Sequence, residues 1–189
     1  NNTIMLRGEV LPTRPFRYLM LHKQAGRICS NVDGAYPSLF NDLEIEKVSE
    51  LHVAGRVDAD TTGLVLITDD GRWTFEIITP AKKCPKVYRV GLSRDLAASL
   101  VERFKHGLQL QGEAQLTQPA ELQILGAREA RLTITEGKFH QVKRMFSAVG
   151  NRVSTLHREQ IGEICLDVPL GEWRYLTRAE VESFAGGGK

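Results

Sequence analysis

The 189-residue sequence has no uninterrupted apolar stretch near the roughly 18–20 residues that a helix needs to cross a bilayer, so we expect no membrane partner. It has only three cysteines, Cys29, Cys84 and Cys165, which lie far apart and form no C-x-x-C pair. This spacing argues against a disulfide scaffold and the usual zinc sites, and is typical of reduced thiols in a cytoplasmic protein. Repeats and low-complexity tracts are also missing, which excludes coiled-coil and collagen-like classes.

What the sequence does contain is an ordinary globular composition, with 42% apolar and 25% charged residues. The length suits one domain, or one domain with a remnant of another. Residues 1–15 hold two prolines and a turn-like Arg7-Gly8-Glu9, so we expect a linker or the end of a preceding module there. Residues 16–189 are expected to form one folded domain.

The net charge of +2 is too small to indicate an anionic partner by itself, but the charged residues are segregated. Basic side chains dominate residues 80–110 and 128–158, whereas acidic side chains gather at residues 42–50. Such segregation can build a basic face that binds phosphate groups. It is equally consistent with ordinary solvated faces, so charge alone leaves both interpretations open.

Apolar periodicity predicts short strands and short amphipathic helices in an irregular order. We expect strands at residues 18–21, 64–67, 87–92, 131–135, 153–156, 164–166 and 173–176. We expect helices at residues 72–79, 95–106 and 139–149, and a final helix opened by the capping box of Thr177 and Glu180. Because many strands are neighbours along the chain, the pattern favours an α+β fold with a largely antiparallel or mixed sheet flanked by helices.

The segment richest in chemistry is Gly55-Arg56-Val57-Asp58-Ala59-Asp60-Thr61-Thr62-Gly63-Leu64. It places acids and hydroxyls in a loop immediately before a buried strand, which is a common arrangement for an active site. The alternative without chemistry is a tight turn in which the carboxylates of Asp58 and Asp60 cap backbone N–H groups.

Three chemical interpretations of this loop compete. Asp58 and Asp60 could bind Mg²⁺ together with a phosphate, as in a magnesium-dependent phosphohydrolase. Asp58 could instead be the nucleophile of a phosphotransfer loop, although His52, Gly55 and Arg56 interrupt the apolar strand that such a loop normally follows. The third interpretation needs a single ionised aspartate and no metal.

Three blocks in fixed order resemble the signatures of the pseudouridine synthase family, in the branch that modifies ribosomal RNA. The segment from Gly55 to Leu64 is similar to the family's G-R-L-D-x-D-T-x-G-L signature, with Val57 replacing the usual leucine. Lys86-Val87-Tyr88 resembles its K-x-Y motif, and Glu136-Gly137-Lys138-Phe139-His140-Gln141-Val142-Lys143-Arg144-Met145 resembles its E-G-[RK]-x-H-Q-V-[KR]-R-M block. Three ordered blocks, in a resemblance that covers roughly residues 16–180, are more specific than one D-x-D pair.

The resemblance implies an isomerase that converts a specific uridine of small-subunit (16S) ribosomal RNA to pseudouridine without a cofactor or a metal. It assigns the catalytic carboxylate to Asp58 and the cation paired with it to Lys143. It also assigns to Tyr88 an aromatic ring that stacks on the flipped-out base. Asp60 and Thr61 are expected to organise the loop, and His140 and Gln141 to pack at the start of a helix.

The expected RNA contacts are the basic residues in and around these blocks: Arg56, Lys86, Lys138, Arg144 and Arg158. The implied partner is 16S ribosomal RNA or an assembling small subunit, and the protein is expected to be a cytoplasmic monomer. In the family an N-terminal RNA-binding domain supplies affinity, so residues 1–15 are expected to be its end and the linker that follows. Outside the enzymes, the alternative is a non-catalytic RNA-binding module with a degenerate enzyme fold.

Overall fold

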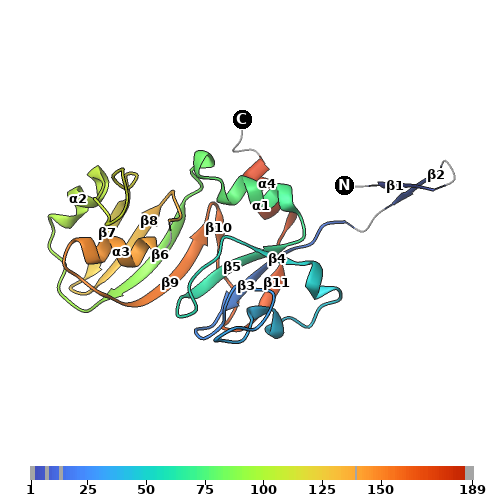
Figure 1. The fold of residues 1–189 in the computed structure, drawn as a ribbon, viewed down its shortest axis with the longest axis horizontal. Helices are drawn as coiled ribbons and strands as arrows, with labels where there is room; N and C mark the ends of the chain where they lie inside the picture. The colour runs from blue at the N-terminus through green and yellow to red at the C-terminus, as the bar shows by residue number, and fades with distance from the viewer. Residues whose placement is uncertain (1–2, 7–8, 13–14, 139, 186–189) are drawn as a thin grey trace.

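A mixed nine-stranded sheet is the main element of the computed structural model, which describes residues 3–6, 9–12, 15–138 and 140–185. Seven strands follow the order β11-β3-β5-β9-β6-β8-β7, while β4 pairs with β5 and β10 pairs with β9. Four helices lie against this sheet (Figure 1). The α+β class and the largely antiparallel sheet expected from the sequence are confirmed.

The strands of the sheet are β3 (Tyr18–Lys23), β4 (His52–Ala54), β5 (Thr62–Thr68), β6 (Lys86–Leu92), β7 (Glu121–Gly126), β8 (Glu129–Ile134), β9 (Val153–Ile161), β10 (Ile164–Cys165) and β11 (Trp173–Tyr175). The helices are α1 (Gly71–Ile78), α2 (Leu100–His106), α3 (Gln141–Ala148) and α4 (Arg178–Ala185). Short 3-10 helices lie at η1 (Leu39–Asp42), η2 (Val48–Glu50) and η3 (Pro80–Lys82).

Strand β5 is buried on both faces, which explains its continuous apolar sequence. Leu64 and Leu66 point to one face and pack with Trp73 of α1. Val65 and Ile67 point to the other face, where residues of η1 cover them. The strand therefore rigidly holds the polar loop that precedes it.

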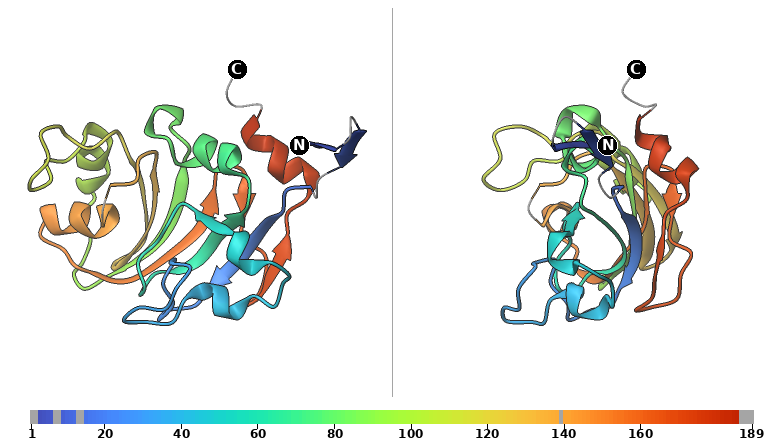
Figure 2. Two further views of the ribbon diagram at one scale, coloured as in Figure 1. Left: turned by 45° about the vertical axis from the view of Figure 1, so that its right-hand side comes forward. Right: turned by 90° about the vertical axis from the view of Figure 1, so that its right-hand side faces the viewer.

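The other half of the sheet, β6 to β9, carries α2 and α3 on one face. Phe104 of α2 and Phe146 of α3 pack together with a ring-centroid distance of 5.0 Å. Both rings belong to an apolar cluster with buried side chains of β6 and β8, among them Val90 and Leu132. Figure 2 shows α2 and α3 at one end of the molecule, away from α1 and α4.

The two halves of the sheet join where β5 runs parallel to β9. The register pairs Thr62 with His157 and Gly63 with Arg158. Gly63 has a φ of +110°, and a Cβ placed there would lie 2.1 Å from the carbonyl oxygen of Arg158. This approach of two backbones requires glycine, because any other residue would bring a side chain into that space.

Most of the predicted elements are present, but some bounds differ. The helix expected at residues 95–106 begins only at Leu100, because the Leu96 N–H donates to the carbonyl of Ala127 and Asp95 pairs with Arg128. Strand β9 continues beyond the expected end at residue 156 to Ile161. The helix expected at residues 139–149 spans Gln141–Ala148, and residue 139 lies outside the described residues. Strand β7 was not predicted.

The capping box at the last helix is confirmed. The Thr177 N–H donates to the Glu180 carboxylate at 2.8 Å, and the Glu180 N–H donates to the Thr177 hydroxyl at 3.2 Å. These reciprocal bonds satisfy two of the N–H groups that a helix start leaves unpaired.

At the N-terminal end, β1 (Thr3–Leu6) and β2 (Glu9–Pro12) form an antiparallel hairpin that stands apart from the main sheet (Figures 1 and 2). That this segment belongs to an RNA-binding domain stays a prediction. Within the described ranges, no helix combines the length and the apolar character that a membrane span requires.

Candidate active site

The loop between β4 and β5 presents Asp58 at the edge of the sheet. A turn closed by the Thr61 N–H, which donates to the Asp58 carbonyl at 3.0 Å, fixes the backbone of the loop. Thr61 is buried, whereas the side chain of Asp58 keeps 26% of its surface exposed. Asp58 is therefore held rigidly while its carboxylate remains accessible to a ligand.

Helix α3 brings two nitrogen groups to this carboxylate. The Nζ atom of Lys143 lies 3.1 Å from Oδ2 of Asp58, and Nε2 of His140 lies 3.2 Å from Oδ1. Lys143 also donates to both carboxylate oxygens of Asp60, at 2.9 and 3.1 Å. The structure thus brings together Asp58 and Lys143, as the sequence predicted, and adds Asp60 and His140 to the same cluster.

His140 is the site residue whose position sequence reasoning missed, since it was expected to pack at the helix start. It occupies the N-cap position of α3 with a left-handed backbone, at φ +49° and ψ +36°. A residue with a Cβ adopts this conformation at a cost of about 1–2 kcal/mol. The available signal was its spacing of three positions from Lys143, which places both side chains on one face at the start of the helix.

The charges in the cluster stabilise one another. Burial alone would lower the pKa of Lys143, but hydrogen bonds to Asp60 and Asp58 outweigh this effect and raise the pKa above its usual value. The hydrogen bond from Lys143 is the main reason that the pKa of Asp60 lies below its usual value. Lys143 and Asp60 therefore both stay charged at neutral pH.

A cleft opens beside this cluster, and Asp58, His140 and Lys143 are among the residues that line it. Tyr88 of β6 forms one wall, next to apolar side chains of Ile134, Val142 and Leu156. The cleft therefore has an aromatic and apolar interior and a charged edge at Asp58.

Tyr88 lines the cleft from β6, on the same face of the strand as Val90 and Leu92. The pairing of β6 with β9 shifts register between Val87 and Tyr88, so that Val87 lies opposite Gln160 and Tyr88 opposite Arg158. A bulge of this kind is common next to active sites. Tyr88 is 8% exposed, so most of the residue packs in the core while a small part of its surface lines the cleft.

A buried lysine supports the loop from beneath. Lys23, at the end of β3, is 1% exposed and donates from Nζ to the carbonyl oxygens of Ala59 at 2.9 Å and Gln24 at 3.0 Å. Burial lowers the pKa of Lys23, although nearby Asp60 and Asp58 act against this effect. Lys23 lies outside the three sequence blocks and was not predicted as a site residue. Its signal was the alternation of Leu19, Leu21 and Lys23 on one face of a strand.

Arg158 was expected to contact RNA, and its burial corrects that role. The side chain is 2% exposed, and its guanidinium donates to the carbonyl oxygens of Leu64 at 2.9 Å and Gly55 at 2.7 Å. Both carbonyls belong to the polar loop or the strand that follows it. The guanidinium therefore fixes the loop from inside the protein and has almost no surface left for a phosphate group.

Lys86 needs the same correction. It is 9% exposed, and its Nζ lies 3.5 Å from the carbonyl oxygen of Glu136, the first residue of the third sequence block. Burial lowers the pKa of Lys86. The side chain points into the protein because β6 alternates, so it supports the segment before α3 from within and does not reach the surface.

The remaining expected RNA contacts lie at or near the rim of the cleft. Arg56 is exposed and lines the cleft, as does the half-buried Lys138. Arg144 is half-buried and lies next to Lys143 on α3. These three cations are available at the surface, so their role as RNA contacts stays a prediction that the geometry permits.

The magnesium interpretation requires Asp58 and Asp60 to face a shared divalent cation. The ammonium of Lys143 lies between their carboxylates, within 3.1 Å of both. Among the described residues, no group of three histidine, cysteine, aspartate or glutamate side chains is arranged to hold a metal ion. The two carboxylates therefore share a lysine ammonium at the place where the divalent cation of that interpretation would bind.

One family model and two related proteins are described by the same activity. The family model described as RNA pseudouridylate synthase matches residues 17–148. The ribosomal small subunit pseudouridine synthase A of Vibrio cholerae is 51% identical over 169 residues, which cover 88% of this chain and 73% of that protein. The protein of the same name from Escherichia coli K12 is 49% identical over 169 residues, with the same coverage.

A solved structure described as a pseudouridylate synthase superimposes on this fold with a TM-score of 0.87. It is 43% identical in sequence, and the match covers 92% of this chain and 76% of that one. The match extends beyond the three sequence blocks to the arrangement of the whole sheet.

Proposed function

The chain belongs to the RNA pseudouridylate synthase family, and on this premise we propose that Asp58 is the carboxylate with which it isomerises uridine. As a member of this family the protein is a pseudouridine synthase that acts on ribosomal RNA. The finer proposal is that its substrate is one uridine of small-subunit (16S) RNA, flipped into the cleft beside Asp58. The observation that carries the proposal is the ion pair of Asp58 with Lys143 at the cleft edge.

The reaction is an isomerisation, so it needs no net input of atoms or electrons. The bond between N1 of uracil and C1′ of ribose breaks, the base turns within the cleft, and C5 forms the new bond to C1′. The proton that leaves C5 is matched by a proton that N1 gains. The protein must therefore hold a detached base, stabilise charge at the sugar and move one proton.

Asp58 is suited to the step at the sugar. Its carboxylate either attacks C1′ as a nucleophile or removes a proton as a base, and both roles require the ionised form. Lys143 at 3.1 Å and His140 at 3.2 Å hold its two oxygens in place. Asp60 shares the ammonium and faces solvent more openly, so we assign it to positioning Lys143.

Tyr88 and the apolar wall are suited to holding the base. A flipped nucleotide must replace the stacking that it loses in RNA, and an aromatic ring provides stacking worth about 1–3 kcal/mol. Because Tyr88 lines the cleft, we also assign its hydroxyl to the proton transfer from C5. The apolar side chains of Ile134 and Val142 exclude water from the detached base.

The exposed cations of the rim are suited to the RNA backbone. Arg56 lies two positions before Asp58, and Lys138 and Arg144 lie on either side of His140 and Lys143. We assign phosphate contacts to these three residues. Because one chain supplies the described groups of the cleft, we further propose that the enzyme acts as a monomer. We also propose that it acts in the cytoplasm, on ribosomal RNA or on an assembling subunit.

The experiment that tests the proposal is a pseudouridine assay on an unmodified small-subunit RNA transcript and on assembling subunits. We expect the unsubstituted chain to form pseudouridine, and Asp58→Asn to form none, because the amide cannot act as a nucleophile or base. Asp95→Asn is the matched control, since it removes an exposed carboxylate that pairs with Arg128 far from the cleft. Turnover by Asp58→Asn would remove the proposed role of Asp58.

The phosphohydrolase interpretation makes the opposite prediction. An enzyme that binds Mg²⁺ through Asp58 and Asp60 loses its activity in EDTA, whereas we expect pseudouridine formation to persist in EDTA once the RNA is folded. A non-catalytic module would bind RNA in a salt-dependent manner and leave every uridine unchanged. The pseudouridine assay therefore separates the synthase from both alternatives, and a phosphate-release assay with and without EDTA separates those two from each other.

A further inference from the structure

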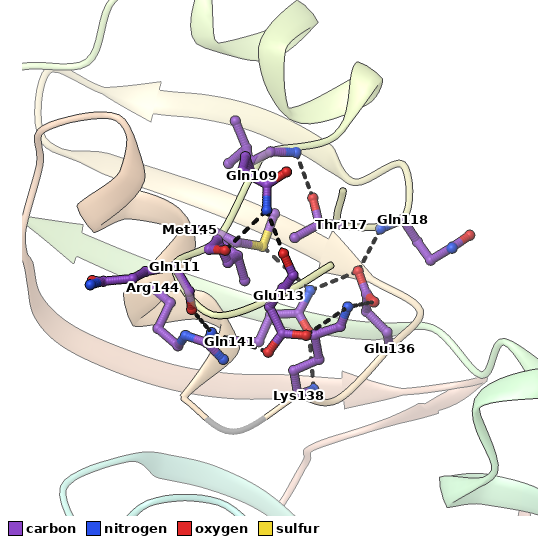
Figure 3. Close-up of polar contacts among 12 residues, drawn as sticks. Gln109, Gln111, Glu113, Thr117, Gln118, Glu136, Lys138, Gln141, Arg144 and Met145 are labelled. Carbon is purple, nitrogen blue, oxygen red and sulfur yellow. Dashed lines mark hydrogen bonds and ion pairs between the residues drawn. The ribbon is translucent and has the colours of Figure 1, made fainter. Parts of the chain in front are cut away.

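Beside the cleft, a closed loop packs against the segment that leads into α3. The loop is closed at its stem, where the Leu108 N–H donates to the Thr117 hydroxyl at 2.8 Å and the Thr117 N–H donates to the Leu108 carbonyl at 2.9 Å. Residues 109–116 project from this stem, and most of them are exposed. Figure 3 shows this loop lying over Lys138, Gln141 and Arg144.

Glu113 is the loop residue that points toward the basic side chains. One carboxylate oxygen lies 3.1 Å from the guanidinium of Arg144, and the other lies 3.7 Å from Nζ of Lys138 (Figure 3). All three side chains are between 27% and 29% exposed. A single carboxylate thus bridges two of the three cations to which we assign phosphate contacts.

Both cations have a second partner that does not depend on the Glu113 side chain. Lys138 lies 3.3 Å from the Glu136 carboxylate, and Arg144 donates to the carbonyl of Gln111 at 2.8 Å. If the Glu113 carboxylate turned away, the two cations would keep their places. They are therefore prearranged for another anion.

The backbone of Glu113 is also fixed independently of its carboxylate. Its carbonyl accepts a hydrogen bond from the Gln109 side chain at 2.7 Å, and its N–H donates to the Leu110 carbonyl at 3.1 Å. The carboxylate can consequently leave the cations by rotation of its own side-chain bonds, without any change in the loop. An exchange of anions at this position requires little rearrangement.

We propose that the Glu113 carboxylate occupies, in the free protein, the place of an RNA phosphate between Lys138 and Arg144. This inference rests on the proposed function, since it assumes that an RNA strand reaches the cleft. Lys138 lines the cleft that holds Asp58, so a phosphate between these two cations would belong to a nucleotide next to the flipped uridine. A carboxylate and a phosphodiester each offer two oxygens and one negative charge to a guanidinium, which permits the exchange.

The exchange makes Glu113 a determinant of RNA affinity. Lys138, Arg144, Glu113 and Glu136 together carry no net charge, so this part of the rim attracts RNA weakly until Glu113 withdraws. A phosphate must displace an existing ion pair, and binding loses the free energy of that pair. RNA that offers a correctly placed phosphate is therefore favoured over RNA that is held by general attraction.

The test compares the affinity of the chain, with and without Glu113→Gln, for an unmodified transcript of small-subunit RNA. Loss of two partly exposed ion pairs is expected to tighten binding about 3- to 10-fold. Glu113→Asp keeps the charge but is too short to bridge both cations, so we expect a smaller gain.

Two controls make the result specific. Glu102→Gln removes the same charge from an exposed position on α2 and should leave affinity almost unchanged. In a chain that already carries Lys138→Met and Arg144→Met, Glu113→Gln should have no effect.

Weaker or unchanged binding by Glu113→Gln, in a variant whose thermal unfolding matches that of the unsubstituted chain, would overturn the exchange. That outcome differs from failure of the proposed function, which would appear as no pseudouridine formation by the unsubstituted chain on the same RNA.

Discussion

The ammonium of Lys143 lies 3.1 Å from Oδ2 of Asp58, an ion pair that joins helix α3 to the loop before β5. The two residues are distant in the sequence, and the fold places them at the edge of one cleft. The same ammonium binds Asp60, so two carboxylates depend on one cation.

Replacing Lys143 should affect the rate more than the fold. In Lys143→Met the two carboxylates face each other without a cation, and we expect turnover to fall by about 100-fold or more, as when other preorganised charges are removed from active sites. Lys143→Arg keeps the charge and should retain part of the activity. The measurement is single-turnover pseudouridine formation, and equal rates for Lys143→Met and the unsubstituted chain would contradict the assignment.

The raised pKa of Lys143 also predicts a pH profile. Because the group keeps its proton beyond the ordinary lysine value of about 10.5, Lys143 should cause no loss of rate between about pH 7 and pH 10. Any fall of rate in that interval must come from another group. A rate profile of the unsubstituted chain and Lys143→Arg, which cannot lose its charge there, checks this expectation, since the two profiles should have the same shape.

Two substitutions of Tyr88 separate stacking from proton transfer. Tyr88→Phe keeps the ring, so we expect its effect to appear in kcat and to report the hydroxyl. Tyr88→Leu loses the stacking as well, which is worth about 1–3 kcal/mol, or about 5- to 150-fold in kcat/KM. If both variants had identical kcat/KM, the ring would not stack on the base. Thermal unfolding of each variant distinguishes this result from a loss of core packing.

Gly63 should tolerate no side chain. In Gly63→Ala the new methyl group would meet the carbonyl of Arg158 at 2.1 Å, and the backbone would keep a φ of +110°. We expect a loss of at least about 3 kcal/mol in the free energy of unfolding, from strain and from separation of the strands. Gly71→Ala is the matched control, because its Cβ has open space and an ordinary φ. That variant should be as stable as the unsubstituted chain or more stable by about 0.4–1 kcal/mol.

Lys86 predicts how stability changes with pH. Its pKa in the folded state is lowered by burial, so between that value and about 10.5 the unfolded chain binds more protons than the folded one. The contribution of Lys86 to the free energy of unfolding therefore rises with pH across this window. Lys86→Met lacks this contribution. As the pH increases, the free energy of unfolding of the unsubstituted chain should therefore rise relative to that of Lys86→Met. Urea unfolding at several alkaline pH values measures it, and a constant difference would contradict the burial effect.

The sequence predicted the part of the site that depends on local order. Asp58, Tyr88 and Lys143 lie in three blocks with distinctive spacing, and these blocks meet at one cleft. The strand after Asp58 was equally predictable, because a run of apolar residues must be buried on both faces. Strong local patterns in the sequence therefore predicted both strand β5 and the reacting side chains of the three blocks.

The sequence could not predict which charged residues are buried. Lys23 and Arg158 occupy inward-facing positions of β3 and β9, where backbone carbonyls from distant segments accept their hydrogen bonds. A charge count assigns such residues to the surface, since burial of lysine or arginine is rare without partners. Their partners are backbone atoms that become neighbours only in the folded chain, so residue types alone gave no sign of them.

The contact of Glu113 with Lys138 and Arg144 was unpredictable for a related reason. Glu113 lies in a loop without regular periodicity, and its partners lie beyond β7 and β8 in the sequence. The late start of α2 has the same kind of cause. The hydrogen bond from the Leu96 N–H to Ala127 of the β7–β8 hairpin keeps the residues before Leu100 out of the helix. In each of these places tertiary contacts override the local pattern.

The narrow parallel junction of β5 and β9 divides the reacting groups between two stretches of chain. Asp58 belongs to the stretch that ends with α1, whereas Tyr88 and Lys143 belong to the stretch from β6 to α3. Neither stretch alone contains a complete set of groups for the chemistry. Turnover thus requires that the two stretches be aligned across this boundary to within the length of a hydrogen bond. A substitution that disturbs the junction would abolish activity even though every reacting side chain remained intact.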